Sequence, residues 1–387
     1  MHNIYFDNSA TTPVLEAAAN RAYEVMISLY GNPSSVHALG VKANEILSLS
    51  RKTVMTSLGV KNMRDYELFF TSSGTEADNM AISGVLNAKS FRFKPRIIIT
   101  DSEHPAVTST AYQAERNGCE VIRLTTKNGI IDIEQLKGAL SGNTVLISVM
   151  TVNNETGAVY DVKNIFSIAK EYCPDIITHT DAIQAYMKLP LDIKKLGADM
   201  ISISGHKIGA PKGIGALLCD SSLITKKRIV PIIHGGGQEG TYRSGTENMP
   251  AVAALSEAVS FRMGLRDAFY EKVKALRERI ISSLPEGVCV NTPKGEFLPH
   301  IISMTCTGIK SEVLLRAMSE KGIYISSGSA CSSKKLKTST VLTAFGLSPN
   351  EADSTVRISL SDSNTEEECD IFCYELADCL KRLAKKH

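Results

Sequence analysis

Short runs of β-branched and other apolar residues recur through the middle of the chain, and amphipathic stretches separate them. The runs lie at residues 96–100, 121–124, 145–149, 176–179 and 200–203. Successive runs begin about 24 to 31 residues apart, which leaves room for a helix between each pair of strands. This alternation favours βαβ crossovers, and it therefore predicts an α/β domain with a largely parallel sheet.

Residues that begin and end helices agree with this alternation. Asp132, followed three residues later by Gln135, resembles a capping box at a helix start. Asp161 is a candidate N-cap for the next helix, and Gly118 lies where the helix from about Pro105 should end. Strand and helix signals therefore support the same series of elements.

A second, smaller unit follows the α/β domain. One long helical pattern runs from residue 251 to about 284, and a final helix is predicted from 366 to 383. We place the domain boundary near residue 262. The predicted organisation is an N-terminal segment that packs with the smaller domain, a large domain, and a smaller α+β C-terminal domain, over residues 1–15, 16–261 and 262–387.

Composition and charge are those of an ordinary globular protein. The chain has 387 residues, of which 43% are hydrophobic and 22% charged, enough for about two domains with full cores. The formal net charge is only +2, so no strong field favours nucleic acid or an anionic membrane. There is no long apolar run or signal-like N-terminus, and the nine cysteines lack the spacing of a disulfide framework. We therefore expect a cytoplasmic protein that binds neither nucleic acid nor membrane directly.

The first candidate for chemistry is the segment 71–79, which turns out of an apolar strand into an amphipathic helix. Free N–H groups and the positive dipole end at a helix start favour an anionic group. Gly74 would let a phosphate approach the backbone, and Thr75 adds a hydroxyl donor. Serine, glycine and threonine also simply cap helices, so this segment alone leaves both interpretations open.

Two further candidates follow strands of the same sheet. Asp181 comes just after a strand, where α/β sheets present ligand-binding groups, and its carboxylate could keep a pyridinium nitrogen protonated. The alternative is an N-capping aspartate. Lys207 is flanked by small and apolar residues that would desolvate its amine for Schiff-base formation, with Ser204 and His206 as phosphate donors. The alternative is a solvated surface lysine.

Cys331 differs from the other cysteines in its surroundings. It lies among serine, glycine and lysine in a polar stretch at about 326–340, which is typical of a functional surface loop. Lys334 and Lys335 would lower the pKa of its thiol if they come near. The alternative is an exposed thiol without a role.

Three cysteines near the C-terminus suggest a metal site at first sight. Cys369 and Cys373 are four residues apart on a predicted helix, and no CxxC pair or HxxxH partner accompanies them or Cys379. We therefore expect them to form the packed face of the last helix, and we predict no metal site.

The order of phosphate turn, carboxylate and lysine resembles pyridoxal-phosphate enzymes of the aspartate aminotransferase fold, fold type I. More narrowly, the chain resembles the class V group called cysteine desulfurases, of NifS/IscS type, from about Tyr5 to Glu368. The segments that carry this resemblance are DNSATTP at 7–13, GNPSS at 31–35, EH at 103–104, VNNETG at 152–157, SGHK at 204–207 and RSGT at 243–246.

The resemblance implies a cofactor, pyridoxal 5′-phosphate, and a role for each matching residue. Lys207 would carry the cofactor as a Schiff base, with His104 stacked on its ring. The remaining cofactor contacts implied are Asp181 at the ring nitrogen, Gln184 at the ring hydroxyl, Asn154, and Gly74, Thr75, Ser204 and His206 at the phosphate. Thr246 would reach the phosphate of a second subunit, which implies a homodimer.

The resemblance also implies the reaction. L-cysteine, bound by Asn32, Asn154 and Arg357, would be converted to L-alanine, and Cys331 would take its sulfur as a persulfide. His104 would shuttle protons, and an acceptor protein, either an iron–sulfur scaffold or a tRNA-thiolation enzyme, would receive the sulfur. From the residues alone, Arg357 would instead be a structural ion pair. The rival functions are a class V aminotransferase, a selenocysteine lyase, and a cofactor-free scaffold that binds partners or a metal cluster.

Overall fold

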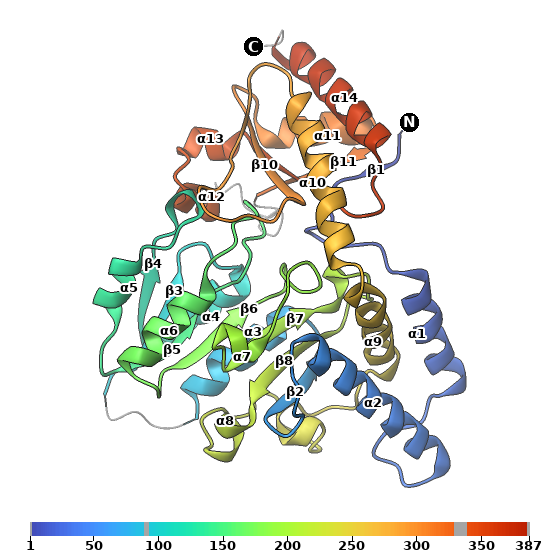
Figure 1. Ribbon diagram of the computed structural model, residues 1–387, viewed down its shortest axis with the longest axis vertical. Coiled ribbons are helices and arrows are strands. Elements are labelled where there is room, and N and C mark those ends of the chain that lie inside the picture. The colour runs from blue at the N-terminus through green and yellow to red at the C-terminus, as the bar shows by residue number, and fades with distance from the viewer. Residues whose placement is uncertain (1, 89–92, 329–338, 385–387) are drawn as a thin grey trace.

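The computed structural model describes residues 2–88, 93–328 and 339–384 of the chain. Two bodies are stacked along the long axis, the larger one below and the smaller one above, and both chain ends lie at the top (Figure 1). Among the described residues, none of the helices combines the length and the hydropathy needed to span a bilayer.

The larger body contains a seven-stranded sheet of order β2-β8-β7-β6-β5-β3-β4. Strand β8 runs antiparallel to both of its neighbours, and all other neighbours are parallel. The largely parallel sheet predicted from the sequence is therefore confirmed. The strands are β2 (Tyr66–Thr71), β3 (Arg96–Thr100), β4 (Glu120–Leu124), β5 (Thr144–Ser148), β6 (Ile177–Asp181), β7 (Met200–Ser204) and β8 (Gly215–Asp220).

Both faces of this sheet are covered. Neighbouring residues on a strand point to opposite sides of the sheet, and buried clusters lie on each side. On β3, Ile98 belongs to one hydrophobic cluster, whereas Ile97 and Ile99 belong to a second cluster on the other face. The helices of the larger body are α1 (Glu16–Ser28), α2 (Ala38–Ser57), α3 (Gly74–Leu86), α4 (Pro105–Arg116), α5 (Ile133–Ala139), α6 (Val162–Tyr172), α7 (Ile193–Leu196), α8 (Ser221–Thr225) and α9 (Met249–Met263). Short 3-10 turns lie at Lys127–Gly129, Gly205–Lys207 and Glu239–Thr241.

Most of the predicted helix signals are confirmed. The Asp161 side chain accepts from the Asn164 amide at the start of α6, and Gly118 has the left-handed φ of 89° after α4. The predicted capping box is confirmed only for its Asp132 half. Asp132 caps α5, but the Gln135 side chain accepts from the amide of Thr125 instead of closing back on the cap.

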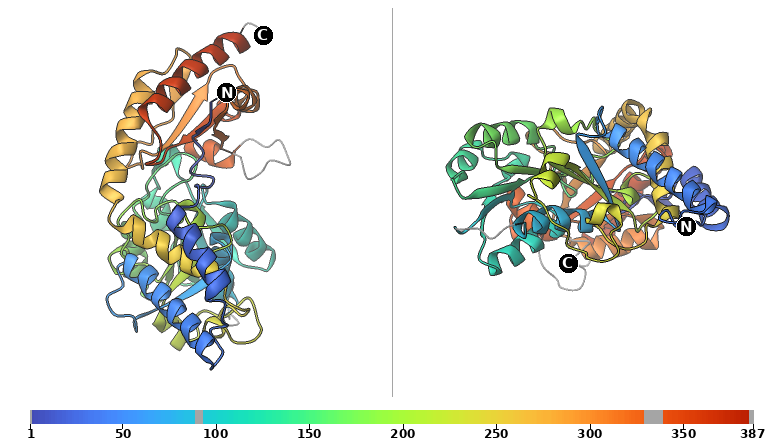
Figure 2. Two further views of the ribbon diagram at one scale, coloured as in Figure 1. Left: turned by 90° about the vertical axis from the view of Figure 1, so that its right-hand side faces the viewer. Right: turned by 90° about the horizontal axis from the view of Figure 1, so that it is seen from below.

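The long helix predicted from 251 to 284 is wrong in one respect, because the chain breaks it into two. Helix α9 ends at Met263, and α10 (Arg266–Ser282) begins after Gly264 and Leu265. Glycine is a poor helix former, and Gly264 is the C-cap of α9. Helix α9 packs on α1 and α2, whereas α10 rises into the upper body and packs on α14 (Glu366–Ala384), as Figure 2 shows from the side. The domain boundary near residue 262 stays a prediction.

The smaller body has a four-stranded antiparallel sheet of order β12-β13-β10-β9. Strand β1 (Ile4–Tyr5) pairs with β11 (Ile323–Tyr324), so the N-terminal residues lie against this body. Cys369, Cys373 and Cys379 are buried in its core, which confirms that they are on the packed face of α14. The remaining elements are β9 (Val288–Val290), β10 (Ile301–Cys306), α11 (Ser311–Glu320), β12 (Ser326–Ser327), α12 (Thr340–Phe345), α13 (Pro349–Asp353) and β13 (Thr355–Ser359).

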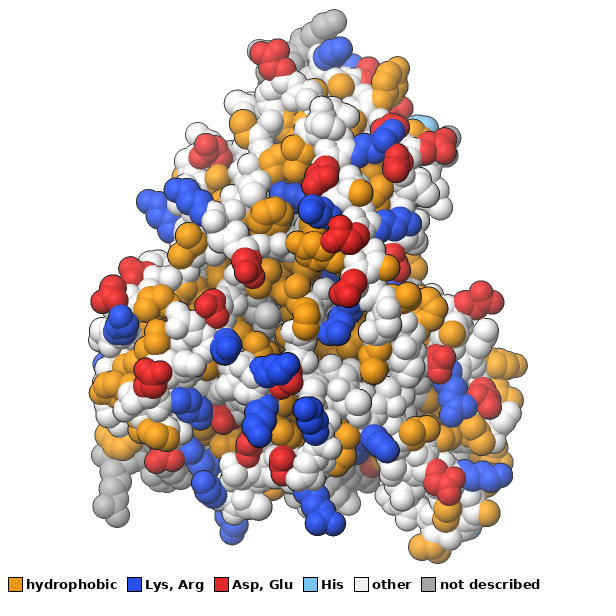
Figure 3. Space-filling view, in the orientation of Figure 1, with side chains coloured by type: hydrophobic (Ala, Val, Ile, Leu, Met, Phe, Trp, Pro, Cys, Tyr) orange, Lys and Arg blue, Asp and Glu red, His pale blue; other side chains and the backbone are white. Residues whose placement is uncertain are grey.

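Charges of both signs are interspersed over the face of the molecule shown in Figure 3. Both bodies carry basic and acidic side chains, with several basic ones near one another low on this face. The formal net charge is +2, from 43 basic and 41 acidic residues.

Candidate active site

A cavity of about 480 Å³ lies at the carboxyl ends of the central strands and reaches residues of the smaller body. This is the edge at which parallel sheets present ligand-binding groups. The structure brings most of the predicted site residues together here, namely Gly74, Thr75, His104, Asn154, Asp181, Gln184, Ser204, His206, Lys207 and Arg357.

The structure does not show the other three predicted residues in this cavity. Asn32 and Thr246 are exposed, and neither lines the cavity of the single chain. Cys331 lies outside the described residues. Gly328 and Ser339, the described residues on either side of its segment, both line the cavity.

Lys207 is placed by the 3-10 turn that follows β7. Its amine donates hydrogen bonds to the carbonyl oxygens of Ser9 and Ala10, the latter at 2.8 Å. The amine is therefore held at the wall of the cavity by backbone groups of the N-terminal segment. Beside it, burial and the charge of Lys207 lower the pKa of His206 to about 4, so the His206 imidazole is neutral at neutral pH.

Asp181 is the last residue of β6, and Gln184 stands on the turn that follows. One Asp181 oxygen accepts from the Ile183 amide at 2.9 Å, and burial raises the pKa of Asp181 to about 6, while Lys207 opposes this rise. The Asp181 carboxyl therefore caps a local turn and also lines the cavity. Gln184 donates to the Ser9 carbonyl at 2.9 Å, and its own side-chain oxygen is buried without a hydrogen-bond partner.

The start of α3 forms the far end of the cavity. Ser73 caps this helix by accepting from the Glu76 amide at 3.2 Å, and Gly74 opens it. A side-chain carbon at Gly74 would lie 2.1 Å from the end of the Ile183 side chain, so Ile183 would have to move to make room for a larger residue. The Ser204 hydroxyl, buried nearby, has no hydrogen-bond partner. A helix N-terminus beside an unsatisfied hydroxyl is suited to an anionic group such as a phosphate.

His104 is the N-cap of α4. Its Nδ1 accepts from the Ala106 amide at 3.1 Å, which leaves the proton of the neutral ring on Nε2. Burial, together with the charge of Lys207, lowers the pKa of His104 to about 4. The imidazole is therefore an uncharged ring at neutral pH.

Arg357 fits both roles considered from the sequence, a substrate-binding residue and a structural ion pair. It lies on β13, lines the cavity, and is also paired with Asp7 at 2.8 Å. It donates to the Asn154 carbonyl at 2.9 Å, and its Nε is buried without a hydrogen-bond partner. A guanidinium in this state can still donate to a carboxylate that enters the cavity.

Two buried carboxyl groups of the cavity were not assigned roles from the sequence, although both lie in the quoted motifs. Glu155 accepts from the Ser339 hydroxyl at 2.6 Å, and burial raises its pKa to about 7. Glu103 accepts from Thr100 and from the Met150 amide through one oxygen, while its other oxygen has no partner. Burial raises the pKa of Glu103 to about 8.

The Glu103→Gln variant should remove part of the pH dependence of stability. The folded protein keeps the Glu103 proton up to about pH 8, whereas an unfolded chain loses it near pH 4.5. The stabilisation from that proton is therefore complete below about pH 4.5 and is lost as the pH rises through 8. In urea unfolding of the cofactor-free protein, the free energy of unfolding of wild type should fall by up to about 5 kcal/mol relative to that of the variant across this pH range. If the stability of the two proteins changed with pH in the same way, the raised pKa of Glu103 would be contradicted.

Comparison with known proteins identifies the family. The family model described as "Aminotransferase class-V" matches residues 4–372. The chain is 38% identical over 371 residues to "Cysteine desulfurase IscS" of Methanosarcina thermophila, covering 95% of this chain and 89% of that protein. It is 39% identical over 390 residues to "NifS/IcsS protein homolog" of Lactobacillus delbrueckii subsp. bulgaricus, covering 99% and 98%.

Solved structures give the same result. A NifS-like protein superposes with a TM-score of 0.90 at 32% identity, covering 98% of this chain and 100% of that one. A structure described as SspA in complex with cysteine superposes with a TM-score of 0.81 at 33% identity, covering 94% and 100%. The chain therefore belongs to the class V aminotransferase family and, within it, to the cysteine desulfurase group of NifS/IscS type.

Proposed function

We propose that the protein is a pyridoxal-phosphate-dependent cysteine desulfurase that converts L-cysteine to L-alanine and transfers the sulfur to Cys331 as a persulfide. The observation that carries this proposal is the cavity that gathers Lys207, Asp181 and Arg357. An amine, a buried carboxyl and a guanidinium are the groups needed to attach the cofactor, to protonate its ring and to bind an amino-acid carboxylate.

The cavity fits the cofactor in its unsatisfied polar atoms. Pyridoxal phosphate carries a ring nitrogen, a ring hydroxyl and a phosphate. Asp181 would hold the protonated ring nitrogen, the Gln184 oxygen would accept from the hydroxyl, and the Ser204 hydroxyl with the start of α3 would hold the phosphate. When bound, this cofactor supplies an electron sink for charge that develops at the substrate Cα.

The residues of the chain would divide the remaining work. The Lys207 amine would move the proton at the substrate Cα, and Arg357 would fix the substrate carboxylate. The His104 ring, uncharged at neutral pH, can accept a proton at Nδ1 once its bond to Ala106 opens. The Cys331 thiolate would attack the substrate sulfur, so that an S–S bond forms and the C–S bond breaks. The electron pair of that bond stays with the carbon skeleton, which leaves as L-alanine after protonation.

A second copy of the chain would complete the site. Thr246 is exposed and does not line the cavity of its own chain, which is what a residue serving a partner subunit requires. Helices α1 and α2, which lie at one lower edge in Figure 1, and the loop between them also carry exposed apolar side chains. These side chains are Tyr23, Met26, Ile27, Tyr30, Val36, Leu39, Val41 and Leu49. We therefore propose a homodimer, with an iron–sulfur scaffold or a tRNA-thiolation enzyme as sulfur acceptor.

Product analysis tests this function against its rivals. The cofactor-loaded protein, given L-cysteine and a thiol reductant, should release L-alanine and sulfide in equal amounts without any keto acid. An aminotransferase would instead consume a keto acid and form a new amino acid from it. A selenocysteine lyase would act on L-selenocysteine and leave L-cysteine unchanged. Either of these outcomes would overturn the proposal.

A further inference from the structure

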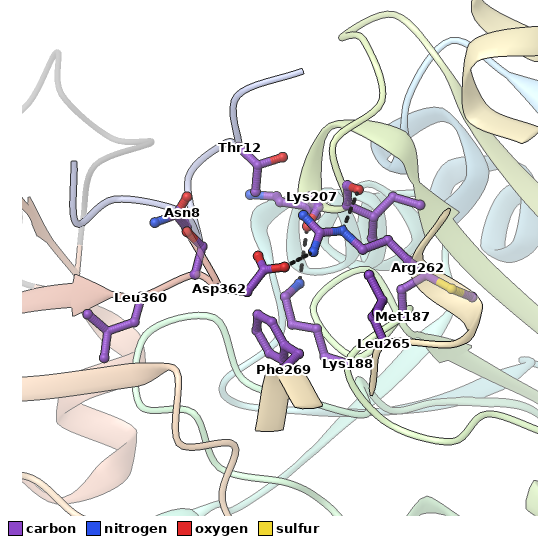
Figure 4. A pocket seen from close by; sticks show the side chains of 12 residues that line it. Asn8, Thr12, Met187, Lys188, Lys207, Arg262, Leu265, Phe269, Leu360 and Asp362 are labelled. Carbon is purple, nitrogen blue, oxygen red and sulfur yellow. Dashed lines mark hydrogen bonds and ion pairs between the residues drawn. The ribbon is translucent and has the colours of Figure 1, made fainter. Parts of the chain in front are cut away.

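A second, smaller cavity lies behind Lys207, on the side where the two bodies meet (Figure 4). Its free volume of about 20 Å³ has room for about one water molecule. The walls are mainly apolar and come from both bodies, through Met187, Ile208, Leu265, Phe269 and Leu360. A charged group in this place would lose most of its hydration.

The amine of Lys188 lies in this cavity. The residue is only 8% exposed, and its Nζ donates to the backbone carbonyls of Gln184 and of Lys207, at 3.3 Å each. On the other side, the side chains of the same two residues both donate to the carbonyl of Ser9. Gln184 and Lys207 are therefore joined twice, by Ser9 through their side chains and by Lys188 through their backbones.

The charged and titratable groups around Lys188 do not favour an ammonium ion. Lys207 lines the same cavity, and His206 lies next to it on the turn after β7. His300, which immediately precedes β10, has its ring 6.0 Å from that of Phe269 in the cavity wall. Asp362 lines the same cavity but is paired with Arg262 of α9 at 2.6 Å. Burial first, and then the charges of Lys207 and Arg262, lower the pKa of Lys188 to about 7.

The number of hydrogen-bond acceptors around Lys188 also favours a neutral amine over an ammonium ion. A neutral amine has two N–H groups and an ammonium has three. Among the described residues, the structure gives Lys188 two hydrogen-bond acceptors, the carbonyls of Gln184 and Lys207. The third N–H group of an ammonium would have no acceptor from the described residues and would depend on a water molecule in the cavity.

We propose that Lys188 is a positioning residue of the cofactor site, whose buried amine ties the backbone of Gln184 to that of Lys207 and can do so without a charge. The uncharged form spares Lys207 a second positive charge behind it. The proposal rests on the proposed function only in assigning Gln184 and Lys207 to the cofactor.

The charge state can be measured without cofactor or substrate. The cofactor-free protein, labelled with ¹³C at lysine Cε, should show one lysine resonance that titrates near pH 7. This resonance should be missing from the Lys188→Met variant and present in Lys163→Met, which changes an exposed lysine of α6. Titration of the Lys188 resonance near the ordinary value of about 10.4 would overturn the uncharged form.

The positioning role is tested by cofactor binding. Lys188→Met loses both hydrogen bonds, so it should bind pyridoxal phosphate about tenfold more weakly than wild type. Lys188→Gln keeps two N–H groups without charge and should recover part of that loss, whereas Lys188→Arg, which adds a permanent charge, should not. Equal affinities in wild type and the methionine and glutamine variants, all folded by circular dichroism, would overturn the role. If wild type itself bound no cofactor, the proposed function would fail, and the titration would still decide the charge of Lys188.

Discussion

The Lys207→Ala variant should lose the visible absorbance of the covalently bound cofactor and should form L-alanine from L-cysteine at least about 10²- to 10⁴-fold more slowly than wild type. The structure holds the Lys207 amine at the carbonyls of Ser9 and Ala10, inside the cavity that also contains Asp181. Under the proposed function, alanine at this position would remove both the point of attachment and the base that moves the substrate proton.

Absorbance spectra and a single-turnover assay for L-alanine check this expectation. Lys163→Ala, on the exposed surface of α6, is the matched control and should behave as wild type in both measurements. The Lys207 variant should remain folded, because the N-terminal segment that its amine contacts is also held by hydrogen bonds from the amide of Ser9 to Ser359 and from the amide of Thr12 to His206. Full absorbance and activity in that variant would remove Lys207 from the reaction.

The Cys331→Ser variant should keep the cofactor absorbance but lose sulfur transfer by at least about 10³-fold, as is typical when an enzyme loses its nucleophile. A serine hydroxyl is not ionised at neutral pH and cannot form a persulfide, whereas a thiolate can. Sulfide release from L-cysteine and mass spectrometry of the protein are the two measurements.

Cys289→Ser is the matched control for this variant, because Cys289 is an exposed thiol on β9. That control should transfer sulfur at the wild-type rate. Loss of transfer in Cys289→Ser together with normal transfer in Cys331→Ser would reassign the nucleophile.

The hydrophobic pattern of the chain predicted the strands and helices well where residues close together in the sequence determine them. The strand runs after residue 96 correspond to β3 to β7, because apolar strands separated by room for a helix have few alternatives to a parallel sheet. The break at Gly264 was missed, because the apolar pattern continues across it while the two helices pack on different bodies.

Site residues could be predicted from the sequence where their side chains have a distinctive chemistry, such as an amine or a carboxylate. Lys207 and Gly74 follow strands of one sheet and Asp181 ends another strand of it, so their meeting in one cavity follows from the fold. The carbonyls of Ser9 and Ala10 carry no signal in the sequence, because every residue has a carbonyl. Lys188 was missed for a related reason, since its partners are backbone atoms and its burial depends on both bodies.

Asn32 and Thr246 illustrate a different limit. Both are exposed in the single chain, so no geometry within it can assign them to the cavity. Arg357 shows that two interpretations need not exclude each other, because the same guanidinium pairs with Asp7 and lines the cavity.

A single turnover of the cofactor-loaded protein with L-cysteine labelled in its sulfur tests the central claim most directly. Peptide mass spectrometry without reductant should find one labelled sulfur atom added to the peptide that contains Cys331, with one L-alanine formed for each. An unmodified Cys331 beside a full yield of L-alanine would contradict the account, as would labelled sulfur on a different cysteine.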